Sequence, residues 1–187
     1  MKARKNIIIL IVFIAIAGCT KDRIGQSNLI PNGDFESWSE NLLLANWESN
    51  SCPFCDPPFE TYIVQKDSSA YHGKFAAKFI YNNIYAAWAE NKFSLSAHPL
   101  FLGGYVKCNL YGTDTVSVRI KLYMNKEVVD SGEWLGTSSI ADYQHIDIPI
   151  SQHSSQVDSA LIRITGGHRT GPAGKNTEFW VDYLNLE

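Results

Sequence analysis

Beyond its first residues, the sequence has no segment in which apolar residues recur at the three-to-four spacing of an amphipathic helix. It has no Gly-x-Ser-x-Gly nucleophile elbow, and its 5 histidines do not occur at metal-binding spacings. Basic residues are not in excess, because 16 Lys and Arg stand against 19 Asp and Glu. These absences argue against a helical domain, an α/β hydrolase and a nucleic-acid-binding surface.

A long apolar run occurs only at the start of the chain. Lys2, Arg4 and Lys5 precede an uncharged stretch over residues 7–17, which is the pattern of a secretory signal peptide. Roughly 11 apolar residues are too few to cross a bilayer, which takes about 20 in a helix. We therefore expect this segment to be removed after export rather than retained as a membrane span.

The end of this run, Ile-Ala-Gly-Cys over residues 16–19, resembles the bacterial lipobox. The resemblance implies cleavage before Cys19 and a lipid on that cysteine, with two or more acyl chains for a stable anchor. The protein would then be held to the outer membrane of the cell envelope, on the periplasmic or the exposed side. We expect a signal peptide (1–18), a lipidated tether (19–27) and one domain (28–187). An ordinary signal peptide with an incidental cysteine is the alternative.

Three of the 4 cysteines lie beyond this anchor. Cys52 and Cys55 flank a Pro-Phe pair in a proline-rich stretch, and we favour a short structural disulfide between them. A redox or zinc half-site is the alternative, but no second CxxC or paired histidine follows. Cys108 would be a buried free thiol in a strand, and its pairing stays open.

Most of the remaining sequence alternates with period two. Alternate residues from Val116 to Met124 are apolar, which is typical of a half-buried antiparallel strand. Asn125-Lys126 then predicts a tight hairpin turn, although without the preferred glycine. Such evenly spaced short strands indicate an all-β fold, an antiparallel β-sandwich. Strands are expected at residues 62–65, 74–81, 85–93, 101–108, 115–124, 127–135, 143–150, 160–164 and 178–186.

Three stretches together resemble jelly-roll domains of the galactose-binding-like class, the architecture of many carbohydrate-binding modules. Asn28 to Glu36, followed by Trp38 and Trp47, is similar to their "N-G-D-F-E … W" opening. Residues 72–78 (HGKFAAK) and 179–186 (FWVDYLNL) are similar to a strand entry and to the closing strand. Residues 102–107 and 113–116 further resemble a domain of Bacteroidota surface lipoproteins associated with carbohydrate metabolism.

The resemblance implies a structural calcium ion between the first and last strands. Its acidic ligands would be Glu36 and Asp182, and Asp34 is a further candidate ligand. Backbone oxygens around residues 67–74 would complete the site. Calcium suits such a site because it accepts six to eight oxygen ligands in flexible geometry. The alternative is that Asp34 and Glu36 are solvated turn residues and that Asp182 caps a turn.

Sugars bind proteins through flat aromatic faces and a few polar groups. Tyr85 and Trp88 lie in a stretch that also holds Asn82, Asn83 and Glu90, so they are candidate ligand-binding residues, and Trp134 is another. Trp38, Trp47 and Trp180 are assigned to core or edge packing. Arg119, Lys121 and Tyr123 with His145 and Asp147 are an alternative sheet-face site, but a solvated face is the favoured interpretation.

These features predict a membrane-anchored, non-catalytic lipoprotein that binds a polysaccharide or oligosaccharide. One alternative is a structural or adhesive surface module that binds a protein by strand addition. A small glycoside hydrolase is the other, because a carboxylate pair such as Glu90 with Asp114 could meet its requirements. Nucleic acid is not an expected partner.

Overall fold

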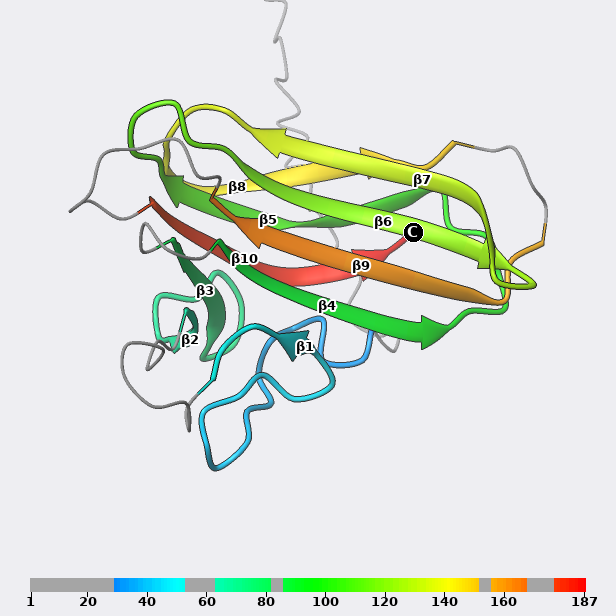
Figure 1. Cartoon of the computed structure of the whole chain (residues 1–187), viewed down its shortest axis with the longest axis horizontal. Helices are drawn as coiled ribbons and strands as arrows, with labels where there is room; N and C mark the ends of the chain where they lie inside the picture. Colours follow the sequence, from blue (N-terminus) through cyan, green and yellow to red (C-terminus); the bar gives the residue numbers. More distant parts are fainter. Residues whose placement is uncertain (1–28, 53–62, 82–85, 152–155, 168–176) are drawn as a thin grey trace, which may run out of the picture.

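The computed structural model describes residues 29–52, 63–81, 86–151, 156–167 and 177–187. They form two antiparallel five-stranded sheets that face each other, which confirms the predicted all-β sandwich (Figure 1). One sheet has the order β1-β4-β9-β6-β7 and the other β2-β3-β10-β5-β8. The strands are β1 (Glu48–Ser49), β2 (Val64–Asp67), β3 (Ala76–Tyr81), β4 (Ala87–Ser94), β5 (Phe101–Asn109), β6 (Val116–Met124), β7 (Glu127–Gly136), β8 (Ile140–Pro149), β9 (Ser159–Gly166) and β10 (Thr177–Leu186).

From β4 onward, each strand lies in the opposite sheet from the strand before it, except at the β6-β7 hairpin. This alternation is the jelly-roll arrangement, in which most connections cross between the two sheets. β1 and β2 add one edge strand to each sheet. No helix in the described part of the chain is long and apolar enough to cross a membrane.

The predicted alternation positions the core between the sheets. Val118, Ile120 and Leu122 of β6 are fully buried, and so are Ile162 and Ile164 of β9, with which β6 pairs. The opposite sheet supplies Phe79, Leu102, Val106, Ile148, Phe179 and Val181. Because successive strand residues point to opposite sides, the residues between these face outward, and any site on a sheet must use them.

The β6-β7 hairpin turns at Asn125-Lys126, as predicted. Met124 pairs with Glu127, so the loop has two residues, and their φ angles are 54° and 72°. Positive φ at both positions gives a turn whose twist matches that of the flanking strands. The Asn125 N–H donates to the Asp158 carboxylate at 2.6 Å, which ties the hairpin to the entry of β9.

The segment before β1 closes one part of the sandwich. Phe35 and Trp47 are buried with ring centroids 5.4 Å apart, and the Trp47 indole N–H donates to the Asn32 carbonyl at 3.2 Å. Trp38 packs partly buried against the core, and its indole N–H donates to the Phe35 carbonyl at 2.7 Å. Both tryptophans therefore have the packing role predicted from the sequence.

Two cysteines can be placed. Cys52 is disulfide-bonded, and its predicted partner Cys55 lies outside the described residues. Cys108 is a buried free cysteine in β5, and burial raises the pKa of its thiol. The interpretation of Cys108 as a buried free thiol in a strand is confirmed. The predicted lipidation site, Cys19, also lies outside the described residues.

Candidate functional site

One candidate site is the outer face of the sheet that contains β4. Strand pairing aligns outward residues into rows, and one row contains Glu90 of β4, Arg163 of β9, Arg119 of β6 and Glu133 of β7. Trp88 precedes this row and Lys92 follows it along β4. We call this surface the Trp88 face, comprising Trp88, Glu90, Lys92, Arg119, Lys121, Tyr123, Glu133 and Arg163.

Trp88 is half-buried, and its surroundings are polar. The Arg163 guanidinium lies 4.6 Å from the centroid of the Trp88 ring, and Arg163 Nη1 donates to Glu90 Oε2 at 2.9 Å. The Trp88 backbone N–H donates to Asn50 Oδ1 at 2.9 Å, which fixes the entry of β4. A flat ring is thus held beside a cation and a carboxylate, a combination that can stack on a sugar ring and bind its hydroxyl groups.

A second ion pair lies across the same face. Arg119 Nε donates to Glu133 Oε1 at 2.5 Å, and both side chains are well exposed. The Lys92 ammonium lies 5.6 Å from the Tyr123 ring centroid. These polar groups are in contact with solvent, so the Trp88 face presents donors and acceptors on both sides of its centre.

The other predicted glycan-binding residues are not added to this face. Trp134 is opposite Val118 in the pairing of β6 with β7, and its ring stacks on the buried Phe179 ring with centroids 5.9 Å apart. Trp134 therefore points between the sheets, because the alternation of β7 places it on the inner side, and it packs the core instead of offering a sugar platform. Tyr85 lies outside the described residues.

Glu36 and Asp182, the predicted metal ligands, both contact the loop formed by residues 68–75. Asp182 is fully buried, and its Oδ2 accepts backbone N–H groups of Tyr71 at 2.7 Å and His72 at 2.9 Å. Glu36 Oε1 accepts the N–H groups of Lys74 at 2.6 Å and Phe75 at 3.0 Å. The structure thus brings together two acids that are far apart in the sequence.

Asp182 has an unusual electrostatic environment. Its Oδ1 is buried and has no hydrogen-bond partner among the described residues. Burial, and to a lesser extent the charge of Glu36, raises the pKa of Asp182 from 3.8 to about 6, against the opposing effect of the backbone hydrogen bonds. A bound cation would satisfy Oδ1 and neutralise the two carboxylates, so the donor set fits a hard cation.

The loop over these acids depends on Gly73. Its φ is +71°, and a Cβ at this position would collide with the Glu36 carboxylate. Asp34 is half-buried in the turn before Glu36, and the contacts to the loop are made by Glu36. In the described part of the chain, no group of three or more His, Cys, Asp or Glu side chains is arranged to hold a metal ion. Additional ligands would therefore have to be backbone oxygens or water.

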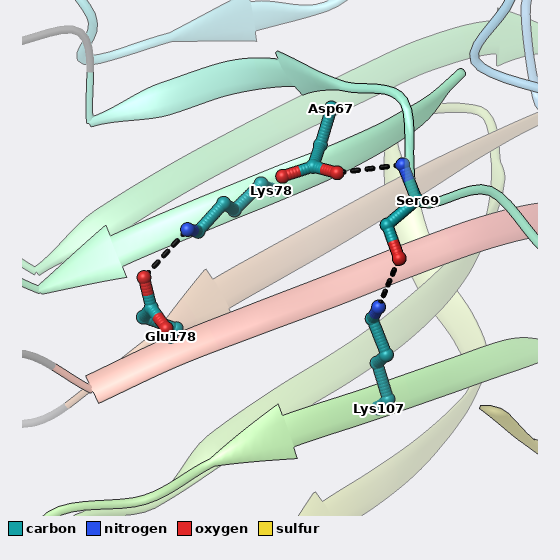
Figure 2. A network of polar contacts seen from close by, with 5 residues as sticks. All are labelled: Asp67, Ser69, Lys78, Lys107 and Glu178. Atoms are coloured by element: carbon teal, nitrogen blue, oxygen red, sulfur yellow. Dashed lines mark hydrogen bonds and ion pairs between the residues drawn. The ribbon is translucent and has the colours of Figure 1, made fainter. Parts of the chain in front are cut away.

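An aromatic and cationic cluster on the other sheet was not predicted. Trp180 of β10 lies half-buried between the ammonium groups of Lys78 and Lys107, each 4.7 Å from its ring. Figure 2 shows how these lysines reach Glu178 and Ser69, respectively, across β3, β10 and β5. Trp180 is therefore an outward residue and not part of the core. The alternation of Glu178, Trp180 and Asp182 in the sequence could have indicated this.

Tyrosine side chains continue this cluster toward the loop over Asp182. The rings of Tyr71 and Tyr105 stack with centroids 3.5 Å apart, and Tyr143 meets Tyr71 edge-on at 6.0 Å. The Tyr143 hydroxyl donates to the Ser69 carbonyl at 2.7 Å. Burial and the nearby charges of Asp182 and Asp67 raise the pKa of Tyr143, so it remains a neutral donor.

The alternative of a sheet-face site that combines Arg119, Lys121 and Tyr123 with His145 and Asp147 is excluded by the strand order. The first three belong to β6, whereas His145 and Asp147 belong to β8 in the opposite sheet. Both groups face outward, since alternate residues of each strand are buried between the sheets. They lie on opposite sides of the sandwich and cannot act on one ligand together.

Solved structures of carbohydrate-binding modules have a similar β-sandwich fold. A family 16 carbohydrate-binding module is 19% identical, with a TM-score of 0.52 over 86% of this chain and 99% of that chain. A family 61 module in complex with β-1,4-galactotriose is 13% identical, with a TM-score of 0.51 over 86% and 98% of the two chains. At these identities the similarity establishes the fold alone.

The same fold also occurs in a candidate glycoside hydrolase from Bacteroides thetaiotaomicron. It is 10% identical, with a TM-score of 0.55 over 86% of this chain and 70% of that chain. No protein-family model matches the sequence. The search of curated proteins also gives no match.

Proposed function

We propose that the protein is a non-catalytic module that binds a polysaccharide or oligosaccharide on the Trp88 face. The observation that carries this proposal is the half-buried Trp88 ring, held beside the Arg163-Glu90 ion pair on an outward sheet surface. Sugar recognition needs an aromatic plane and a small number of oriented polar groups, and both are present here. The fold shared with carbohydrate-binding modules supports the same function.

A hydrolytic role for the carboxylate pair considered above has less support. Glu90 lies on the outer face of β4 and is paired with Arg163, whereas Asp114 is only 3% exposed. A glycosidase needs both carboxyl groups on either side of one scissile bond. Because Asp114 is buried and Glu90 lies on an outer surface, the two carboxylates cannot flank one glycosidic bond. This argues against hydrolysis by this pair.

We further propose that Glu36 and Asp182 hold a structural calcium ion. The support is the buried Asp182 Oδ1 without a partner and the proximity of a second carboxylate. Calcium would supply the positive charge that the loop N–H groups only partly provide. The ion would fasten residues 68–75 to β10, and its role would be stabilisation.

We also propose that the mature chain begins at a lipidated Cys19 and is anchored to the outer membrane. Support comes from the basic residues, the apolar run and the lipobox-like Ile-Ala-Gly-Cys at residues 16–19. Replacing Cys19 with Ala should abolish incorporation of a labelled fatty acid and release the protein from the membrane fraction. The matched control is Cys108→Ala, which removes a different cysteine. Equal labelling of both variants would contradict the anchor.

Replacing Trp88 with Ala tests the binding proposal. We expect glycan affinity to fall by about 30-fold or more, since a central aromatic contact is worth roughly 2 kcal/mol or more. Affinity electrophoresis and calorimetry against a polysaccharide panel would measure it. Trp88→Phe should retain part of the affinity because it keeps a flat ring.

Tyr71→Ala provides the control, because Tyr71 is a 50% exposed aromatic residue associated with the opposite sheet. Its binding should match that of the unmodified protein. Circular dichroism would establish that all variants are folded. A folded Trp88→Ala variant that binds as well as the unmodified protein would remove the Trp88 face from the proposal.

A further inference from the structure

The charged residues at the centre of the Trp88 face are all basic. β9 and β6 lie side by side in the middle of the sheet, and their charged residues are Arg163, Arg119 and Lys121. The acidic residues of the row lie on the strands to either side, with Glu48 and Glu90 on β1 and β4 and Glu133 on β7. Across the whole chain, acidic residues outnumber basic ones, with a formal net charge of -3. The basic centre of the Trp88 face therefore differs from the average charge of the chain.

Two of these cations lie directly opposite each other. Arg119 pairs with Arg163 in the register of β6 and β9. Directly opposed residues have Cα atoms about 4.5–5.5 Å apart, and like charges in such positions repel. Each guanidinium is relieved by a flanking carboxylate, through Arg119 Nε to Glu133 and Arg163 Nη1 to Glu90. The pair nevertheless keeps two positive groups next to each other in the centre of the face.

Both guanidinium groups remain accessible to a ligand. The side chains of Arg119 and Arg163 are 52% and 41% exposed. The ion pairs with Glu133 and Glu90 involve one nitrogen of each guanidinium, and a guanidinium carries five N–H donors in total. Arg163 also lies against Trp88, so a group bound to Arg163 is placed next to the indole ring.

The next row of the face adds more positive charge. Lys92 and Lys121 both align with Leu161 of β9, one from each side, and both lysines are exposed. Four cations therefore occupy two adjacent rows beside Trp88. A neutral sugar needs hydroxyl-binding groups but does not need such a concentration of positive charge.

We propose that the Trp88 face is selective for acidic polysaccharides, with uronic-acid carboxylates received by Arg119 and Arg163. This inference rests on the proposed glycan-binding function and specifies its ligand class. The planar guanidinium fork matches a carboxylate and binds it with paired hydrogen bonds. The sugar ring that carries the carboxylate lies against Trp88, and Lys92 and Lys121 attract the acidic groups of neighbouring sugars.

The test compares polysaccharides that differ only in charge. The full chain in detergent is titrated by calorimetry with polygalacturonate, glucuronoxylan and hyaluronan, and with the same polymers after chemical reduction of their carboxyl groups to alcohols. We expect at least one acidic polymer to bind, with affinity falling about tenfold or more on reduction. Binding should also weaken with added salt, because surface charges are screened.

Variants assign the effect to residues. Arg119→Gln and Arg163→Gln should each weaken binding of the acidic polymer about tenfold, and the corresponding Lys variants should retain part of it. Lys66→Gln is the control, because it removes one exposed positive charge from the opposite sheet. Its affinity should stay within twofold of the unmodified protein.

The outcomes separate the two proposals. If a polymer and its reduced form bind equally, acid selectivity is wrong while glycan binding stands. If acidic polymers bind but both Arg variants match the Lys66→Gln control, the assignment to this face is wrong. Failure to bind any polymer, acidic or reduced, contradicts the acidic ligand class; if a wider panel of neutral polysaccharides also fails to bind, the glycan-binding function is wrong as well.

Discussion

Replacing His98 with Ala should destabilise the fold by about 1.5–3 kcal/mol, because it removes a hydrogen bond between two buried side chains, one of them a carboxylate. His98 Nε2 lies 2.6 Å from Asp130 Oδ2, and the two side chains are 9% and 0% exposed. His98 Nδ1 lies 2.9 Å from the Pro99 carbonyl, so both ring nitrogens face oxygen atoms. Chemical denaturation at neutral pH would measure the loss.

The matched control is His145→Ala. His145 also faces a carboxylate, that of Asp147, at 3.5 Å, but these side chains are 42% and 58% exposed. An exposed pair of this kind contributes at most about 1 kcal/mol. If both variants lose the same small amount of unfolding free energy, the buried pair does not stabilise the contact between the β4-β5 connection and β7, and this interpretation of His98 is wrong.

Replacing Asp182 with Asn should raise stability at pH 7.5 when calcium is removed by a chelator. The raised pKa of about 6, against an ordinary 3.8, means that the folded state holds the Asp182 proton more tightly than the unfolded state does. The contribution of Asp182 to stability is therefore fully present below about pH 4 and is lost as pH rises through about 6. The advantage of the Asn variant at pH 7.5 should be on the order of 2–3 kcal/mol, and it should shrink toward pH 4.

Calcium should reverse this order. With the ion bound, the charged Asp182 is the favoured form, so the unmodified protein should gain thermal stability on calcium addition while the Asn variant gains little. Asp147→Asn is the control, because Asp147 is an exposed carboxylate on the same sheet. An identical response to calcium in the unmodified protein and in Asp182→Asn would contradict a calcium site at this residue.

The two candidate sites lie on different sheets. The Trp88 face belongs to the β1-β4-β9-β6-β7 sheet, while Asp182 lies in β10 of the other sheet. A ligand on one outer face does not touch the other. Removing calcium should therefore lower thermal stability without changing glycan affinity at temperatures where the protein is folded.

The strands could be predicted from the sequence because each has a buried face. All nine expected strands overlap an observed strand, and residues 127–135 and 101–108 differ from β7 and β5 by one residue. β1 was missed because it has two residues and no alternation to detect. It forms because Glu48 and Ser49 pair with Glu90 and Ala89 of β4. Such pairing is a tertiary contact and cannot be predicted from the local sequence pattern.

The candidate sites were only partly predictable. Glu36 and Asp182 could be found from motif similarity, and the structure brings them to one loop. Trp88 could be found as an aromatic residue among polar ones. Trp134 was misassigned to ligand binding because alternation shows which strand residues share a side and does not show which side is inward. The stacking of the Trp134 ring on the buried Phe179 ring shows that Trp134 faces inward.

The central rows of the Trp88 face required the strand register. Arg119 and Arg163 are 44 positions apart by their residue numbers, and only the pairing of β6 with β9 shows that they are opposed. The same applies to Lys78, Trp180 and Lys107, which come from three strands. Period-two patterns predict each strand separately, whereas a site on a sheet depends on the order in which the strands pair.

The most direct test of the central claim is to observe the tryptophan indole signals by NMR during titration with a polysaccharide that binds. If the Trp88 face is the binding site, the Trp88 indole N–H signal shifts in a saturable way, together with backbone signals of β4, β9 and β6. The Trp180 signal, from the opposite sheet, should not move. Saturable shifts confined to Trp180 and to β3, β10 and β5, with the Trp88 signal unchanged, would contradict the account.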